Sequence, residues 1–280
     1  MPDEFLYSVR GPKSWMMMTS YELTDALKET DVALVPCGAI ENHAGGLPLG
    51  QDNFQIEEIT RRAVLKLAAD GKKAIFGPTI PFGPISNRHF KGNIHIKPTT
   101  MILLIKEVCQ NLFRDGIRNI ILVKGHDMTL GALMVAAREL ADDTDDALKV
   151  IVANWLPWVV KRLPEIFDKI PKGKRDGHGG AGEASRMLWQ HPELCVQEAM
   201  KDYNVNATVS PTPFISPIVS GGGVYFPRKT TNTDPDFEGI LGFPTIGTPE
   251  AGDLMYDEIS GWIAAVAKEY CYGTPKTYNY

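Results

Sequence analysis

Cysteine is scarce in this sequence, and long apolar runs are missing. The four cysteines, at positions 37, 109, 195 and 271, lie far apart and form no CxxC pair, which argues against a cysteine-ligated zinc site or a redox motif. No apolar stretch approaches the ~20 residues that span a bilayer. The N-terminal run MPDEFLYSVRGPKSW is too polar for a signal peptide. We therefore expect reduced cysteines, no membrane association and a cytoplasmic location.

The sequence also has no excess of positive charge. It holds 29 Lys and Arg residues against 34 Asp and Glu residues, which gives a formal net charge of −5. Nucleic-acid-binding domains normally carry a basic face, so we expect no nucleic-acid partner. There is no internal repeat, no low-complexity segment and no phosphate-binding GxxxxGKS/T loop.

What the sequence does contain is a regular alternation of short β-rich apolar runs with helical patterns. Hydrophobic residues make up 44% of the chain, which is enough for a buried core. Strands that alternate with helices predict an α/β fold with a mostly parallel β-sheet sandwiched by helices. We expect a single α/β domain over residues 1–280, with an N-terminal arm (1–18) and a C-terminal tail (271–280).

The expected elements follow from periodicity and from helix start signals. Thr19-x-x-Glu22 is a capping-box signature for a helix that ends before Asp31. Thr248 followed by Pro249 marks the start of a long C-terminal helix that runs to Tyr270. The remaining expected strands are 32–37, 74–76, 119–123 and 150–153, the remaining helices are 53–67, 101–113, 130–140 and 183–190, and residues 207–226 look β-like.

The first group of candidate site residues directly follows the strand at 32–37. Glu41 and His43 are two residues apart, so in an extended segment their side chains point the same way. A Gly- and Pro-rich loop then leads to Asp52 and can bring it back toward them. Two carboxylates and an imidazole suit Zn, Mn or Fe. Each residue also has an ordinary interpretation as a loop residue, and Asp52 with Gln55 could instead form a capping box.

The second group follows the strand at 119–123. His126 comes directly after this strand, and the carboxyl ends of parallel strands meet at one edge of a sheet, where sites form. We therefore expect His126 near Glu41. Taken alone, His126 could be a structural histidine, and Asp127 could cap the next helix.

The third group is the glycine-rich segment DGHGGAGEAS (176–185). It contains the GxGxxG spacing of dinucleotide-binding loops, but that motif must follow a strand, and the polar, Pro-broken residues 169–176 do not form one. A loop that presents His178 and Glu183 to a pocket explains the residues better.

These segments, taken in order, resemble the creatininase family. The run PCGAIENH (36–43) followed by LPLGQD (47–52) resembles the family signature PxGSxEQHGxHLPLGTD. The pair GH (125–126) resembles the NGH element, and residues 178–185 resemble HAGxxETS. Looser matches are HFKGN (89–93) to the H-x-PGT region and GILGFP (239–244) to GVxGDP. The matches are collinear and span roughly residues 20 to 265.

The resemblance implies a parallel α/β sandwich, often assembled as a hexamer, with two divalent metal ions (Zn, Mn or Fe). It implies that Glu41 and His126 hold one ion, that His43 holds the other, and that Asp52 bridges both. It assigns His178 to proton handling or substrate binding. In this family a metal-bound hydroxide attacks a carbonyl carbon of a small polar molecule.

Two positions depart from the family pattern. Creatininase has a glutamate ligand two residues after its equivalent of His126, where this chain has Met128, and an asparagine where this chain has Lys124. Creatinine is therefore a doubtful substrate. Glu183 is the best candidate to replace the missing ligand; otherwise it would be a catalytic-site carboxylate that orients a ligand histidine.

The substrate expectation depends on the polar residues near the expected site. Lys124, Asp127 and His89, with Asn87 and Arg88, would suit a hydroxyl- and keto-rich ring, so we favour ring opening of an oxidised inositol of the 3-dehydro-scyllo-inosose type. The alternatives are an amidohydrolase acting on a cyclic amide or formamide, and a non-catalytic metal-binding assembly protein. We also expect a homo-oligomer, a hexamer by resemblance.

Overall fold

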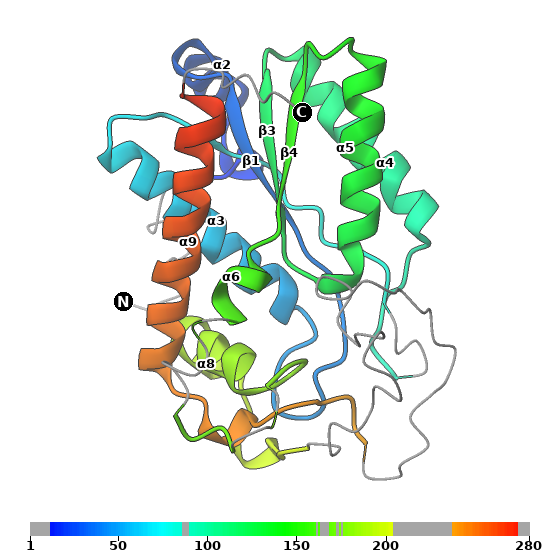
Figure 1. The fold of residues 1–280 in the computed structure, drawn as a ribbon, viewed down its shortest axis with the longest axis vertical. Helices are drawn as coiled ribbons and strands as arrows, with labels where there is room; N and C mark the ends of the chain where they lie inside the picture. Colours follow the sequence, from blue (N-terminus) through cyan, green and yellow to red (C-terminus); the bar gives the residue numbers. More distant parts are fainter. Residues whose placement is uncertain are drawn as a thin grey trace, which may run out of the picture.

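A four-stranded parallel sheet forms the centre of the fold (Figure 1). The computed structural model describes residues 12–85, 90–160, 162, 168–171, 174, 176–203 and 237–273. The sheet order is β2-β1-β3-β4, and the strands are β1 (Val32–Cys37), β2 (Ile75–Phe76), β3 (Asn119–Lys124) and β4 (Lys149–Ala153). The predicted α/β fold with a parallel sheet is confirmed.

Helices cover both faces of this sheet. They are α2 (Ser20–Glu29), α3 (Gln51–Ala69), α4 (Pro98–Arg114), α5 (Leu130–Asp143), α6 (Leu156–Val160), α8 (Ala181–Gln190) and α9 (Pro249–Cys271). Short 3-10 turns are η2 (Trp15–Met17), η3 (Asp127–Thr129), η4 (Pro192–Leu194), η5 (Gln197–Ala199) and η6 (Pro244–Ile246). Within the described ranges, no helix is both long and apolar enough to cross a membrane.

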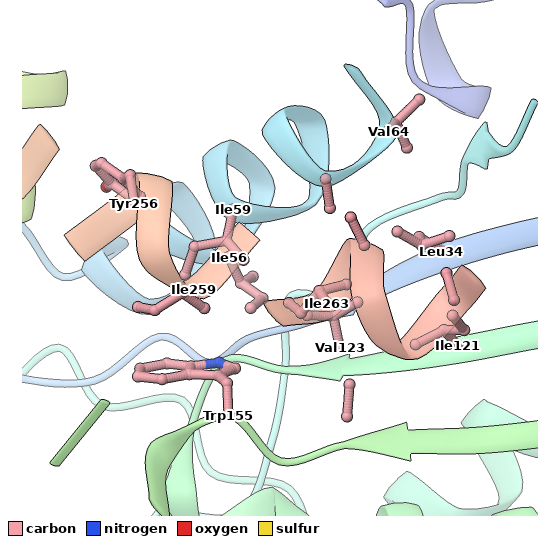
Figure 2. Packing of buried hydrophobic residues seen from close by; sticks show 14 of the residues in the cluster. Leu34, Ile56, Ile59, Val64, Ile121, Val123, Trp155, Tyr256, Ile259 and Ile263 are labelled. Atoms are coloured by element: carbon pink, nitrogen blue, oxygen red, sulfur yellow. The ribbon is translucent and has the colours of Figure 1, made fainter. Parts of the chain in front are cut away.

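The two faces of the sheet take alternate residues of each strand, as the pleat requires. Leu34 and Val123 face α3 and α9, where Trp155 packs near Ile259 and Ile263 (Figure 2). Their neighbours along the strands face α4 and α5. β1 and the centre of β3 are buried on both sides, which explains the apolar runs VALVPC and IILV.

The starts of α2 and α9 agree with their capping signals, and most other predicted ends differ by a few residues. Thr19 and Glu22 form the predicted capping box, in which Glu22 N donates to Thr19 Oγ1 at 3.3 Å and Thr19 N donates to Glu22 Oε2 at 2.8 Å. Thr248 caps α9 by accepting from Ala251 N. The predicted β-like stretch at 207–226 lies outside the described residues.

The carboxyl ends of β1 and β3 lie side by side. Cys37 pairs with Lys124 in the parallel register, and Gly125 N donates to Cys37 O at 2.7 Å. A Cβ atom on Gly125 would lie 2.8 Å from Cys37 O and 3.1 Å from Asp52 O, so only glycine allows this approach. The segments after both strands therefore leave from one edge, as predicted.

Candidate metal centre

The loop after β1 carries the first two candidate ligands back toward the sheet. Glu41 N donates to Leu49 O at 3.1 Å, which closes the loop before α3 begins. Glu41 is 2% exposed and His43 is fully buried. Ala44 has a left-handed φ of 55°, and its N–H donates to the Asn42 side chain at 3.0 Å. This local bond favours the left-handed turn after His43.

Asp52 lies inside α3 and does not cap it. The helix begins at Gln51, its N-cap residue is Gly50, and no side chain caps it. The capping-box alternative for Asp52 and Gln55 is therefore wrong, because the helix begins two residues earlier than a cap at Asp52 needs. Likewise, Thr129 and not Asp127 is the N-cap residue of α5. Asp52 is in the first turn of its helix, where a carboxylate is stabilised by the helix dipole.

Glu41, Asp52 and His126 form the first group of possible metal ligands. His126 Nδ1 lies 3.2 Å from Glu41 Oε2 and 3.2 Å from Asp52 Oδ2. One ligand atom from each of the three residues lies within 4.8 Å of the others, and all three residues are buried. The structure thus brings residues from the ends of two neighbouring strands to one point.

His43, Asp52 and Glu183 form the second group. His43 Nε2 lies 3.4 Å from Glu183 Oε2 and 4.0 Å from Asp52 Oδ1. His43 Nδ1 is 2.9 Å from Glu41 O. A carbonyl only accepts hydrogen bonds, so Nδ1 carries the proton and Nε2 of the neutral ring offers its lone pair to this group. Asp52 belongs to both groups, one oxygen facing each.

His178 lies beside both groups and is more accessible than they are. Its Nδ1 is 3.4 Å from Glu41 Oε2, and its Nε2 is 2.8 Å from Asn42 O. Its ring centroid is 4.4 Å from that of His43. The side chain is 22% exposed, compared with 3% or less for Glu41 and His43. His178 therefore lies between the buried ligands and the surface, and with Glu41 and His43 it forms a third group of possible ligands.

These residues fit a cation. Four of their buried atoms have no hydrogen-bond partner within the described part of the chain: Glu41 Oε2, His43 Nε2, Asp52 Oδ2 and His126 Nε2. Buried polar atoms are nearly always satisfied. Three carboxylates gathered in a buried space also need positive charge. Divalent ions would meet both requirements, and the carboxylate and imidazole donors suit Zn, Mn or Fe.

The pKa values of the site show the same demand for positive charge. Burial alone would lower the pKa of His43, but the contact with Glu183 and the charges of Asp52 and Glu41 raise it to about 9. The pKa of His126 is also raised to about 9, because Glu41 and Asp52 outweigh burial. The pKa of Glu183 is lowered despite burial, first by its contact with His43. In the metal-free chain, protons on the imidazoles supply the positive charge.

This predicts a pH dependence of metal binding. Because the pKa values of His43 and His126 are raised to about 9, an incoming ion must displace their protons at neutral pH. Metal affinity should therefore rise with pH up to about 9, by up to tenfold per pH unit for each proton displaced, since only deprotonated ligands bind. Titrating the apoprotein with Zn²⁺ at several pH values, in buffers of different ionisation enthalpy, measures the protons released. An affinity independent of pH between 6 and 9 would contradict the ligand set.

Asp176 holds the glycine-rich loop, a role that the sequence analysis missed. Its carboxylate accepts three backbone N–H groups, from Ala181 at 2.6 Å, Gly182 at 2.8 Å and Phe243 at 3.1 Å. Glu183 Oε2 also accepts from Gly179 N at 2.7 Å. An Asp five residues before a helix start was the available signal. The loop leads directly into α8, so it positions both His178 and Glu183.

The three predicted substrate-binding residues are placed differently. Lys124 is 2% exposed, donates to the Asp127 carboxylate, and lies over the Trp155 ring at 5.8 Å. The Asp127 side chain is 29% exposed. His89, like Asn87 and Arg88, lies outside the described residues. Lys124 is thus buried and paired with Asp127, and the substrate role of all three residues stays a prediction.

Comparison of the sequence with models of known protein families gives one match that covers most of the chain. The sequence model described as "Creatininase: Creatinine amidohydrolase" matches residues 16–267. The chain belongs to the creatininase family. It is therefore a creatininase-family hydrolase, and the predicted resemblance is confirmed.

Several characterised relatives act on different substrates. The chain is 24% identical over 181 residues to 3-dehydro-scyllo-inosose hydrolase of Thermotoga maritima, with 65% of this chain and 57% of that one covered. It is 26% identical over 231 residues to the mycofactocin precursor peptide peptidase of Mycolicibacterium smegmatis, with 81% of each covered. It is 25% identical over 186 residues to creatinine amidohydrolase of Pseudomonas putida, with 61% and 69% covered. The match thus spans just over half of the inosose hydrolase.

Solved creatininase structures share the fold. One described as "Creatininase Mn" superposes with a TM-score of 0.70 at 22% identity, covering 92% of this chain and 98% of that one. A mutant creatininase described as "Zn-Zn type" gives 0.69 at 21% identity with the same coverage. At 21–22% identity, this structural similarity shows that the fold is shared and does not identify the substrate.

Proposed function

We propose that this chain is a dinuclear metal hydrolase. Glu41, Asp52 and His126 would hold one divalent ion, and His43, Asp52 and Glu183 the other. The observation that carries this proposal is the membership of Asp52 in both ligand groups. With neutral imidazoles, the three carboxylates of the two groups carry a charge of about −3, which two divalent ions can balance. Glu183 then takes the place of the ligand missing at Met128.

The chemistry follows from the position of each side chain. A pair of divalent ions supplies a Lewis acid for a substrate carbonyl and a water whose pKa is lowered to about 7. His43 and Asp52 are held in the core and keep their donor atoms aimed at the centre. His178 is held at Nε2 by Asn42 O, and its Nδ1 faces the ligand group, 3.4 Å from Glu41 Oε2. That nitrogen can hold a proton and pass it to the leaving atom.

For the substrate we favour a small polar ring that carries a carbonyl, of the oxidised-inositol type. The similarity to 3-dehydro-scyllo-inosose hydrolase supports it, and so does Met128, which departs from the creatininase pattern. Hydrolysis of an amide bond is the second candidate. It is supported by the match to the mycofactocin precursor peptide peptidase, which covers 81% of both chains.

A substrate panel tests this proposal. Metal-loaded protein would be assayed with a 3-dehydro-inosose, creatinine, a formamide and a short peptide, with the Asp52→Ala variant as the blank for each. We expect metal-dependent opening of the keto-inositol ring above that blank. If only creatinine, the formamide or the peptide is hydrolysed, the second candidate, amide-bond hydrolysis, would be favoured instead. Two bound ions with no turnover of any substrate would instead indicate a non-catalytic metal-binding protein.

Glu183 gives a prediction specific to the second ion. Glu183→Gln keeps the size of the side chain but removes its charge, so the His43-side ion should be lost under mild chelation while the His126-side ion stays. Elemental analysis after dialysis should fall from two ions per chain to one. Arg186 and Gly179 contact Glu183, so a thermal melt on the same preparation is needed to check the fold. Two ions retained with wild-type affinity would exclude Glu183 as a ligand.

A further inference from the structure

A buried series of hydrogen-bonded side chains connects the two ligand groups on the side away from His178. Asp52 Oδ1 accepts a hydrogen bond from Gln55 Nε2 at 3.1 Å, and the same amide nitrogen donates to Gly125 O at 3.0 Å. Gln55 Oε1 accepts from Arg186 Nε at 2.8 Å. Gln55 is 1% exposed and Arg186 is 2% exposed. The chain of bonds thus runs from α8, through α3, to the residue before His126.

Arg186 fixes the orientation of the Gln55 amide. Arginine has five N–H donors and no acceptor, so the oxygen of Gln55 must face Arg186. The NH₂ group of Gln55 must then face Asp52 and Gly125 O, both of which are acceptors. Without Arg186 the amide could turn over, and its oxygen would then face the Asp52 carboxylate. The guanidinium is held in place by the Trp155 ring at 5.6 Å and Met255 Sδ at 3.7 Å.

Gln55 in turn fixes the Asp52 carboxylate. With one lone pair of Oδ1 engaged by Gln55, the carboxylate cannot rotate without breaking that bond. Its Oδ2 then faces His126 Nδ1 at 3.2 Å, and its Oδ1 keeps a second lone pair on the side of His43 Nε2, 4.0 Å away. This is the orientation that a ligand shared between two ions requires. The bond to Gly125 O also holds the segment that carries His126.

We propose that Gln55, oriented by Arg186, is the positioning residue that sets Asp52 as the shared ligand. The proposal rests on the proposed function, because it assumes that Asp52 binds both ions. Arg186 also lies 4.0 Å from Glu183 Oε1, so one guanidinium supports both carboxylates of the second group. Neither Gln55 nor Arg186 faces the accessible side of the centre, where His178 lies.

The test is a metal titration of four variants. Gln55→Met keeps the length of the side chain and removes the amide, and Gln55→Asn keeps an amide that is too short to reach both acceptors. Both should lower the affinity of both Zn²⁺ sites together, by about 10–100-fold, the usual effect of removing a group that orients a metal ligand. Arg186→Met should act in the same direction, and Arg186→Lys, which also only donates, should recover most of the affinity.

Gln190→Met is the matched control. Gln190 is also a buried glutamine, 9% exposed, and it bonds Phe54 O at 3.0 Å and the Tyr256 hydroxyl at 2.6 Å without contacting a ligand. The Gln190→Met substitution should lower the melting temperature and leave both Zn²⁺ affinities unchanged. If Gln55→Met does not fold, Gln55→Asn decides. Wild-type protein without bound metal would refute the proposed function; two ions in wild type and equal affinities in the Gln55 variants would overturn only this inference.

Discussion

Asp52→Ala should empty both metal sites at once. One oxygen of this carboxylate faces His126 and the other faces the His43 side, so among the described residues Asp52 alone belongs to both groups. The affinity for both ions should fall by more than the ~10–100-fold that loss of an outer hydrogen-bond partner causes. Turnover should fall to the background rate. Elemental analysis of the purified variant, together with Zn²⁺ titration, measures the loss.

Glu58→Ala is the control for this result. Glu58 is a second buried carboxylate on α3, 4% exposed, and it pairs with Arg61 and Arg62 at 2.6 Å and 2.8 Å, away from the ligand groups. The Glu58→Ala substitution should reduce the free energy of unfolding, because two arginines lose a partner, but the variant should keep both ions. Full metal occupancy in Asp52→Ala would refute the shared-ligand arrangement.

His178→Ala should keep both ions and lose turnover. Its imidazole is 22% exposed beside the buried ligands, a position from which it can reach both substrate and solvent. Loss of a general acid or base lowers the rate by about 10²–10⁴-fold. Metal content, melting temperature and initial rate measured on one preparation separate the three possible roles. A missing ion would make His178 a ligand, a lower melting temperature with lower activity would make it structural, and an unchanged rate would remove it from the mechanism.

His191→Ala is the matched histidine variant. His191 follows α8, its ring centroid lies 5.0 Å from that of Phe54, and its Nδ1 lies 2.9 Å from Glu193. It is not part of any ligand group among the described residues. Its loss should leave metal content and rate within a factor of about two, because it lies outside the ligand groups and its ion pair with the exposed Glu193 is weak.

The fold and the ligands were predictable for related reasons. Strand patterns placed Glu41 and His126 at the carboxyl ends of two strands, and parallel strands share that edge. The pairing of Cys37 with Lys124 confirms the shared edge. The sequence could not show which atoms meet, since that depends on side-chain direction across the sheet. The catalytic and metal-binding roles of the predicted site residues stay predictions, and so does the hexamer.

The supporting residues were harder to find. Asp52 and Gln55 are three residues apart, which is the spacing of a capping box and also the spacing of neighbours on a helix face. The two interpretations differ by two residues in the helix start, and helix ends are the least certain part of any sequence prediction. Arg186 is linked to Gln55 across 131 positions of sequence, and no local pattern signals such a contact.

The ligand groups draw on three distant segments: the loop after β1 with the start of α3, the turn after β3, and α8. Ions bound there would tie these segments to one another and would bind only the folded chain. Each ion present at a hundred times its dissociation constant adds about 2.7 kcal/mol to the free energy of unfolding. Without the metal the folded chain would therefore lose this contribution to its stability and become more sensitive to heat and proteolysis, in addition to lacking activity.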